Sequence, residues 1–555
     1  MAGVAALLIL AVTVIRLREA RHAVWPGHAD PAFFFGVAQN IRAGGGPNID
    51  YVWHYLVPHA QLHHYAFDYW LPAPSYLMAL GLLVGHGLPA ALSVGILLVP
   101  VFAASIFLLT RELAGTAWAP ALAAVLAAVA PGTTNLVLQP ESAIYLSAFT
   151  GVAMAAAVYA RRRPRLWILA GVASALATMS RSEGMLLSAA VLLVAIVWRT
   201  IIPRLRQVRY LLIGFLPLIT VYVVVNLVHF SSPLPPASSA FPFIDNYQQL
   251  SAVQVPHTVH ALLGGGTSSD FITQRWISLK GLWPTTERLA TRNTSLLFIL
   301  AVLLAAASRL GWFGRSRGRG FEEHTAAAPA AELDRAAAAP AADAEPHPLK
   351  AAWRAGWQSS AILPALFTVA VIAVDCLAAP VVSSAGATYK AGLTLVPLVV
   401  VLGLQFIAQA RPYNLLGGLL AVCLVIPQLT ILRPVARSTL NYDNAVGYNE
   451  LRFIRQLRAE QACLRQPLVL MTPRPWEFTQ ATGIPSVMYP SGPQSDVLTI
   501  VGKYGVTDVY DPGARPGLQT ATRQAADGYG PLAVSAQLPP PSFYRFRATT
   551  PGARC

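Results

Sequence analysis

The sequence predicts a mostly α-helical membrane protein: a polytopic transmembrane helical bundle of about eleven spans, a long first outer loop and a small C-terminal α/β extracytoplasmic domain. Three observations support this fold class. Hydrophobic residues make up 55% of the 555 residues and charged residues only 12%, whereas a soluble globular domain carries about 25% charge. Apolar runs of near-spanning length recur along most of the chain. After Arg433 the composition becomes that of a water-soluble domain.

The expected spans are separated by short polar connectors. A helix needs about 20 apolar residues to cross roughly 30 Å of hydrocarbon. The segment 73–88 is expected to be a re-entrant or interfacial helix instead. Spans are expected near 3–24, 91–110, 117–134, 142–160, 166–180, 185–199, 210–230, 294–312, 361–381, 391–410 and 414–432.

Basic connectors set the expected orientation. Under the positive-inside rule, connectors that carry arginines without an acidic residue are cytoplasmic. Counting spans from them places the first loop (25–90) and the part after residue 433 on the outer side of the plasma membrane. Arg16, Arg18 and Arg21 oppose this orientation, because they lie near the outer end of the first span. We give more weight to three later connectors: 161–165, 199–209 and 309–320.

The formal net charge of +15 does not indicate nucleic-acid binding, because the basic residues lie in short loops between apolar runs. The expected environment is therefore the lipid bilayer. The first apolar segment has no small-residue cleavage site, so we expect it to stay as an anchor. Residues 1–432 are predicted to form the transmembrane domain, with a cytoplasmic linker over 313–358 that is partly disordered because it is rich in Ala and Pro.

Residues 433–555 are predicted to form the small α/β domain, because strand and helix patterns alternate there with short Gly and Pro punctuation. This part lacks a Gly-rich phosphate loop, so no nucleotide is assigned to it. An outer location would permit a disulfide between Cys463 and Cys555, whose pairing stays open. Helices are expected over 451–461, 475–483 and 496–505, and strands over 467–472, 485–490 and 506–511.

The first loop opens with a short apolar helix that carries a carboxylate at its start. Asp30 and Pro31 are expected to be its N-cap and first helical residue. The helix is expected to end at Gly44–Gly46. Its apolar residues recur with helical spacing, which suits a helix lying in the bilayer interface; they are Phe33, Phe34, Val37 and Ile41.

The predicted topology brings a set of charged and polar residues to one side of the membrane. Charges at membrane ends are costly unless they are paired or used, so such a collection is a candidate site. Transfer of a sugar from a lipid phosphate to a hydroxyl needs a carboxylate base and cations that hold the departing phosphate. The candidates are Asp30, Glu141, Arg181, Glu183, Tyr389 and Lys390.

Each candidate also has a purely structural interpretation. Asp30 would serve only as a helix cap, and Glu141 only as a first-turn acid that favours the helix dipole. Arg181 and Glu183 would simply pair with each other in a tight turn. Lys390 would be a lysine that extends to the membrane interface, which is the commoner fate of a lysine at a span end.

Histidines and aromatic residues crowd the rest of the first loop. The histidines, with Asp50 and Asp68, could bind a divalent ion, but their spacing fits no tight ligand template. We therefore predict no metal site and no cofactor. The aromatic residues are interpreted first as an interfacial belt and second as a surface for stacking on a sugar. These residues are His54, His59, His63, His64, Trp53, Tyr55, Tyr65, Tyr69 and Trp70.

Four short motifs carry a resemblance to a known family. They are DYWLPAPSYLMAL (68–80), PES (140–142), SRSEG (180–184) and GATYKAGLTLVP (386–397), behind a first loop that opens with an acid and a helix. This order resembles the GT-C glycosyltransferases, especially the bacterial branch related to protein O-mannosyltransferases and aminoarabinose transferases. The likeness is best over 25–190 and moderate to about 430. The resemblance implies a polyprenyl-phosphate-sugar donor, an acceptor glycan, lipid or protein, and an inverting reaction on the outer side of the membrane.

By this resemblance Asp30 is the general base, and Arg181, Glu183 and Lys390 belong to the donor site. Many family members have two adjacent acids where this chain has Asp30-Pro31. That difference leaves open whether Glu141 replaces the second acid and whether a metal is required.

The predicted function is a membrane glycosyltransferase. The alternatives are a lipid-linked-sugar flippase or other transporter, for which no internal repeat is seen, and an inactive scaffold. The sugar, the acceptor and the oligomeric state stay open.

Overall fold

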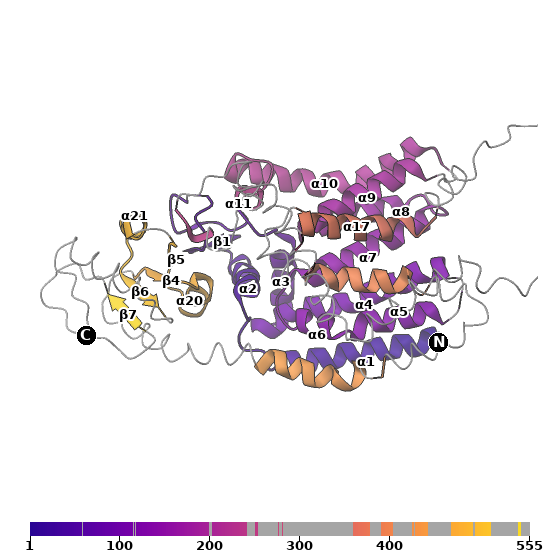
Figure 1. The fold of residues 1–555 in the computed structure, drawn as a ribbon, viewed down its shortest axis with the longest axis horizontal. Helices are drawn as coiled ribbons and strands as arrows, with labels where there is room; N and C mark the ends of the chain where they lie inside the picture. The colour runs from indigo at the N-terminus through magenta and orange to yellow at the C-terminus, as the bar shows by residue number, and fades with distance from the viewer. Residues whose placement is uncertain are drawn as a thin grey trace, which may run out of the picture.

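The computed structural model places a helical bundle beside a small β-sheet along the long axis of the molecule (Figure 1). The structure describes residues 1–240 except 58, 115, 117 and 199–201, and residues 468–511 except 492–493. Between and after these ranges it describes 250–253, 276, 280, 359–377, 390–402, 404, 425–426, 428–441 and 542–545.

Helices dominate the first 240 residues, as the sequence predicts. A helix over residues 428–441 runs past position 433, where the soluble domain is expected to begin. The helices are α1 (Ala2–Ala20), α2 (Ala29–Arg42), α3 (Ala73–Val84), α4 (Gly87–Ala114), α5 (Ala119–Val129), α6 (Pro131–Val137), α7 (Ala143–Ala160), α8 (Leu166–Thr178), α9 (Glu183–Val197), α10 (Arg204–Phe230), α11 (Pro236–Ala240) and α17 (Ile362–Leu377).

Several helices are apolar, and three of the described ones are long enough to cross a membrane: α4, α7 and α10. The pair α5 and α6 makes a fourth if the two count as one bent span. Helices α3, α8, α9 and the helix Lys390–Leu402 are apolar but shorter. The expected span at 294–312 and most of the one at 414–432 lie outside the described residues, so the number of eleven stays a prediction.

The expected span at 117–134 is broken, and a buried arginine compensates for the break. Pro131 has no N–H, so the helix bends by 47° between α5 and α6. The Thr133 hydroxyl donates to the freed carbonyl of Ala127 at 3.0 Å. Arg16 is buried in α1 and donates to the Ala128 carbonyl at 2.6 Å and to the Thr134 hydroxyl at 2.7 Å. Arg16 thus satisfies one carbonyl group and one hydroxyl group at the helix break, which accounts for its burial near the end of α1.

The first loop folds into an aromatic core rather than facing lipid. The ring centroids of Phe33 and Trp70 are 4.2 Å apart, and Trp70 stacks on Trp53 with ring centroids 4.1 Å apart. Trp53, Tyr55 and Trp70 are buried, while Tyr65 and Tyr69 are half-buried. The apolar stripe of α2 is therefore covered by protein. The sequence predicted that lipid covers the apolar face of α2 and that the aromatic residues form a belt at the membrane interface. Both predictions are corrected, because the aromatic residues of the loop pack against α2 and against one another.

A five-stranded sheet joins the first loop to the C-terminal part. The strand order is β2-β5-β4-β6-β7, parallel except for the β6–β7 pair. Its edge strand β2 (Tyr51–Val52) comes from the first loop and pairs with β5 (Ser486–Met488). A separate two-stranded sheet pairs β1 (Asn48–Ile49) with β3 (His64–Tyr65). The remaining elements are β4 (Leu470–Thr472), α20 (Pro475–Thr482), α21 (Gln494–Tyr504), β6 (Asp508–Asp511) and β7 (Ser542–Arg545).

The order of these C-terminal strands and helices agrees with the sequence prediction. Gly483 ends α20 with a φ of +73° and Gly505 follows α21 with a φ of +64°, the left-handed conformation that favours glycine. The expected helix at 451–461 and both Cys463 and Cys555 lie outside the described residues.

Close packing of α8 against α10 depends on two glycines. A Cβ added to Gly214 would lie 2.0 Å from the carbonyl oxygen of Ile168, and one added to Gly171 would lie 2.1 Å from that of Leu211. Small residues at such crossings let the two backbones approach closely.

We predict that Gly214→Ala lowers the thermal unfolding midpoint of the detergent-solubilised protein, because the α8 backbone must move away. The cost expected for overpacking is about 1–3 kcal/mol. The matched control is Gly36→Ala in α2, where no described atom lies within 4 Å of the added Cβ. That variant should be neutral or stabilised by up to about 1 kcal/mol. Equal midpoints for the two variants would contradict the packing account.

Candidate active site

One lysine bridges two carboxylates that come from distant parts of the sequence. The Lys390 ammonium donates to the Asp30 carboxylate, and its Nζ lies 2.8 Å from Glu141 Oε1. Asp30 is in the first turn of α2, Glu141 lies just before α7, and Lys390 begins the helix Lys390–Leu402. The fold thus brings three residues predicted from sequence to a single point.

A histidine and an arginine extend this cluster. His28 Nε2 lies 3.2 Å from Glu141 Oε1. Arg181 Nη1 donates to the Ser142 hydroxyl at 3.2 Å, next to Glu141. Arg181 also pairs with Glu183, at 2.7 Å between Nη2 and Oε1. The pairing of Arg181 with Glu183 expected in the tight turn is therefore present, and the guanidinium also contacts the loop that carries Glu141.

Asp30 is not a helix cap. The helix α2 begins at Ala29, and the N-cap is His28, whose side chain makes no capping hydrogen bond among the described residues. Asp30 therefore lies one position inside the helix, where the positive end of the helix dipole favours a carboxylate. Its pairing with Lys390 replaces the capping role expected from the Asp30-Pro31 pair.

The electrostatics of the cluster keep Glu141 ionised although it is buried. Burial alone would raise the pKa of Glu141, but Lys390 and His28 outweigh it and hold this pKa well below its usual range. Partial desolvation would lower the pKa of the half-exposed His28, but the neighbouring Glu141 carboxylate outweighs it and raises the pKa. Burial would lower the pKa of Arg181, but Glu183 outweighs it and raises this pKa above its ordinary value. Glu141 and Arg181 are thus charged near neutral pH, and Glu141 favours the protonated form of His28.

The two carboxylates that contact Lys390 differ in access. The side chain of Asp30 is 27% exposed, whereas that of Glu141 is 0% exposed. Asp30 is therefore the more accessible of the two carboxylates, and Glu141 contacts both Lys390 and His28 from a buried position.

All the predicted site residues except Tyr389 are described, and they lie in this cluster. Tyr389 lies outside the described residues. The sequence analysis missed His28, which stands two residues before Asp30. The available signal was only this proximity in sequence.

Comparison with known proteins identifies the class. Residues 71–228 match the family described as dolichyl-phosphate-mannose-protein mannosyltransferase. No curated protein matches the chain by sequence. The matched stretch contains Glu141, Arg181 and Glu183 but neither Asp30 nor Lys390. The match confirms the resemblance inferred from the sequence motifs, and the chain is a glycosyltransferase.

Three solved structures are similar to this chain in fold. ArnT from Cupriavidus metallidurans bound to undecaprenyl phosphate is 14% identical, with a TM-score of 0.49 over 98% of both chains. The Archaeoglobus fulgidus oligosaccharyltransferase in the apo form is 13% identical, with a TM-score of 0.46 over 91% of this chain and 69% of that one. The arabinofuranosyltransferase AftD from Mycobacteria is 14% identical, with a TM-score of 0.48 over 98% of this chain and 40% of that one.

The His28–Glu141 pair makes stability depend on pH. Because the pKa of His28 is raised in the folded protein, the stabilisation is fully present below about pH 6.5 and is lost as the pH rises through the raised value. We predict that His28→Gln lowers the thermal unfolding midpoint at about pH 5.5 and much less at about pH 9. The effect should be on the order of 1 kcal/mol or less, because His28 is largely exposed.

The matched control is the same substitution in a Glu141→Gln background, which removes the partner. There the effect of His28→Gln should no longer vary with pH. A pH dependence that persists without Glu141 would contradict the assignment.

Proposed function

We propose that this membrane glycosyltransferase moves a monosaccharide from a polyprenyl-phosphate donor to an acceptor on the outer face of the membrane, with inversion. The observation that carries the proposal is the bridge of Lys390 between Asp30 and Glu141. It places a cation suited to phosphate beside a partly exposed carboxylate suited to accept a proton. The acceptor is a glycan, a lipid or a protein.

The phosphate of the donor is held by Lys390 and Arg181 in this proposal. A guanidinium presents a planar set of donors that matches phosphate oxygens, and a lysine acts as a point charge. Both cations are already neutralised, Lys390 by Asp30 and Glu141 and Arg181 by Glu183. An arriving phosphate therefore competes with Asp30 for Lys390. When it succeeds, the Asp30 carboxylate is released from the ion pair and is free to accept a proton.

The proposed reaction is a single displacement at the anomeric carbon. The acceptor hydroxyl oxygen forms the new bond to this carbon while the bond to the phosphate oxygen breaks. Asp30 takes the hydroxyl proton, and the polyprenyl phosphate leaves as an anion that Lys390 and Arg181 stabilise. Attack opposite to the leaving group inverts the anomeric centre. Glu141 and Glu183 keep the two cations in position, Tyr389 is assigned to the donor, and the step uses no cofactor because these cations serve the leaving group.

We predict that Asp30→Asn reduces transfer by about 100- to 10,000-fold, because it removes the proton acceptor at nearly constant shape. The assay is sugar transfer from a panel of radiolabelled polyprenyl-phosphate monosaccharides, with membranes of the source cells as acceptor. The matched control is Asp50→Asn, since Asp50 belongs to the same loop and pairs with the exposed His63. Wild-type activity in Asp30→Asn would refute the base assignment.

We predict further that Lys390→Gln raises the KM for the donor at least about tenfold, because one charge-assisted contact to the phosphate is worth about 1.5–3 kcal/mol. The KM for the acceptor should change little. An unfolding midpoint measured in parallel separates this effect from loss of structure, since the variant leaves the buried Glu141 without its lysine. A folded variant with an unchanged donor KM would remove Lys390 from the donor site.

A further inference from the structure

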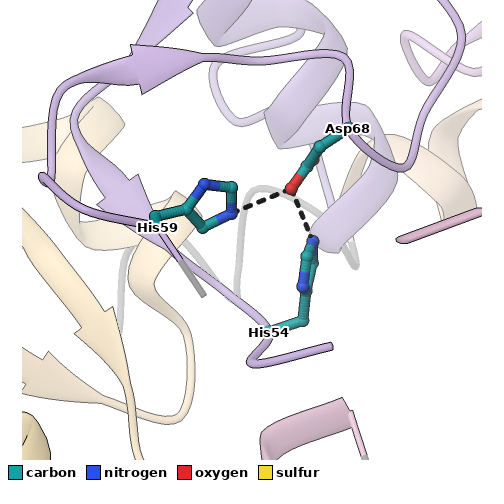
Figure 2. A group of neighbouring side chains, drawn as sticks. All are labelled: His54, His59 and Asp68. Carbon is teal, nitrogen blue, oxygen red and sulfur yellow. Dashed lines mark ion pairs between the residues drawn. The ribbon is translucent and has the colours of Figure 1, made fainter. Parts of the chain in front are cut away.

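Two histidines and an aspartate of the first loop form a second buried cluster, apart from the Lys390 site. His54 Nε2 and His59 Nε2 each lie 2.9 Å from the same oxygen, Asp68 Oδ2. Figure 2 shows the two imidazoles pointing at this carboxylate from two sides. His54 and Asp68 are fully buried, and the side chain of His59 is only 9% exposed.

These short contacts do not have hydrogen-bond geometry. Among the described residues, neither ring nitrogen of His54 and neither carboxylate oxygen of Asp68 has a hydrogen-bond partner. The cluster therefore contains a buried carboxylate whose two imidazole neighbours are close but poorly aligned. Buried polar groups that lack hydrogen-bond partners are unfavourable, and a bound ion would satisfy them.

We propose that His54, His59 and Asp68 bind a divalent transition-metal ion, with zinc the ion that fits best. The one ligand atom that each residue offers lies within 4.8 Å of the other two. Zinc binds imidazole nitrogen and carboxylate oxygen at about 2.0–2.2 Å, so two of its tetrahedral ligands lie about 3.4 Å apart. The observed separations of 2.9 Å need to open by about half an ångström, which small side-chain rotations provide.

The chemistry of the donor set favours zinc over calcium or magnesium, because imidazole suits transition metals whereas hard cations prefer oxygen ligands. The sequence analysis predicted no metal site, because the spacing of the four histidines and two aspartates of the loop, taken as one set, fits no ligand template. The structure separates these residues. His63 pairs with Asp50 at 2.7 Å, and both are exposed. His64 stacks on His59 with ring centroids 3.8 Å apart, and its Nδ1 donates to the Leu62 carbonyl at 2.8 Å.

The three ligands are anchored on three different parts of the fold. His54 follows the edge strand β2, which pairs with β5 of the C-terminal sheet. The carbonyl of His59 accepts a hydrogen bond from the Tyr504 hydroxyl of α21 at 2.9 Å. The carbonyl of Asp68 accepts from Ala237 N of α11 at 3.0 Å. A metal ion at this point would therefore tie the sheet to the helical bundle.

The test is zinc binding by the full-length protein in detergent. The wild type is stripped with a chelator, dialysed and titrated with zinc sulfate, and bound zinc is measured by mass spectrometry. We expect about one tightly bound zinc per chain in the wild type and in His63→Gln, the matched control in the same loop. We expect at least about tenfold weaker binding in His59→Gln. His59 is chosen because it is the most exposed of the three ligands.

A second readout is independent of sugar transfer. Zinc that binds only the folded state raises the unfolding midpoint, so chelator should lower the midpoint of the wild type and of His63→Gln but not that of His59→Gln. The proposal is overturned if the stripped wild type binds no zinc, or if His59→Gln binds it as tightly as the wild type. If His59→Gln fails to fold, a wild-type midpoint that does not respond to chelator or zinc likewise overturns the proposal.

Discussion

The charge bridge at Lys390 is the constraint on which the rest of the bundle depends. A lysine with two carboxylates in a largely buried place is stable only if all three side chains keep their positions, because a single missing partner leaves a buried charge uncompensated. Asp30, Glu141 and Lys390 come from the start of α2, the loop before α7 and a helix more than two hundred residues later. The bridge therefore holds the starts of three separate helices close together. The phosphate of the proposed donor would change these ion pairs, because it competes with Asp30 for the Lys390 ammonium.

The first loop connects this charge cluster to the C-terminal sheet through side-chain contacts and strand pairing. Phe33 of α2 contacts Trp70, which stacks on Trp53, and Trp53 lies 6.4 Å from Trp476 of α20. Aromatic pairs of this kind add about 0.5–1.5 kcal/mol each beyond the surface that they bury. Asp30 stands three residues before Phe33, so a displacement of the aromatic core would move the carboxylate as well. The His54–His59–Asp68 cluster lies in the same loop, and the proposed metal would hold this connection in place.

The sequence predicted features that depend on local pattern, and it failed where distant residues decide. Helix positions follow from runs of apolar residues, and the ends of α20 and α21 follow from Gly483 and Gly505. The position of charged residues at span ends predicted one cluster, and the structure brings its members together: Asp30, Glu141, Arg181, Glu183 and Lys390. The cap assigned to Asp30 was wrong because Lys390, 360 residues away, competes for its carboxylate. The aromatic belt was wrong because periodicity does not show whether protein or lipid covers a face. The burial of Arg16 was not predicted, because its partners, the Ala128 carbonyl and the Thr134 hydroxyl, lie at the α5–α6 break more than a hundred residues away.

The edge strand β2 has a consequence for how the protein is made. The Tyr55 hydroxyl, next to this strand, bonds to the Met488 carbonyl of β5, 433 residues later in the chain. Ribosomes add about 5–20 residues per second, so the first loop waits roughly 20 to 90 s before its partner strand exists. During that interval the loop is held in an unpaired state on one side of the membrane while the bundle inserts. The first loop can therefore complete its sheet only after the chain has been synthesised as far as β5.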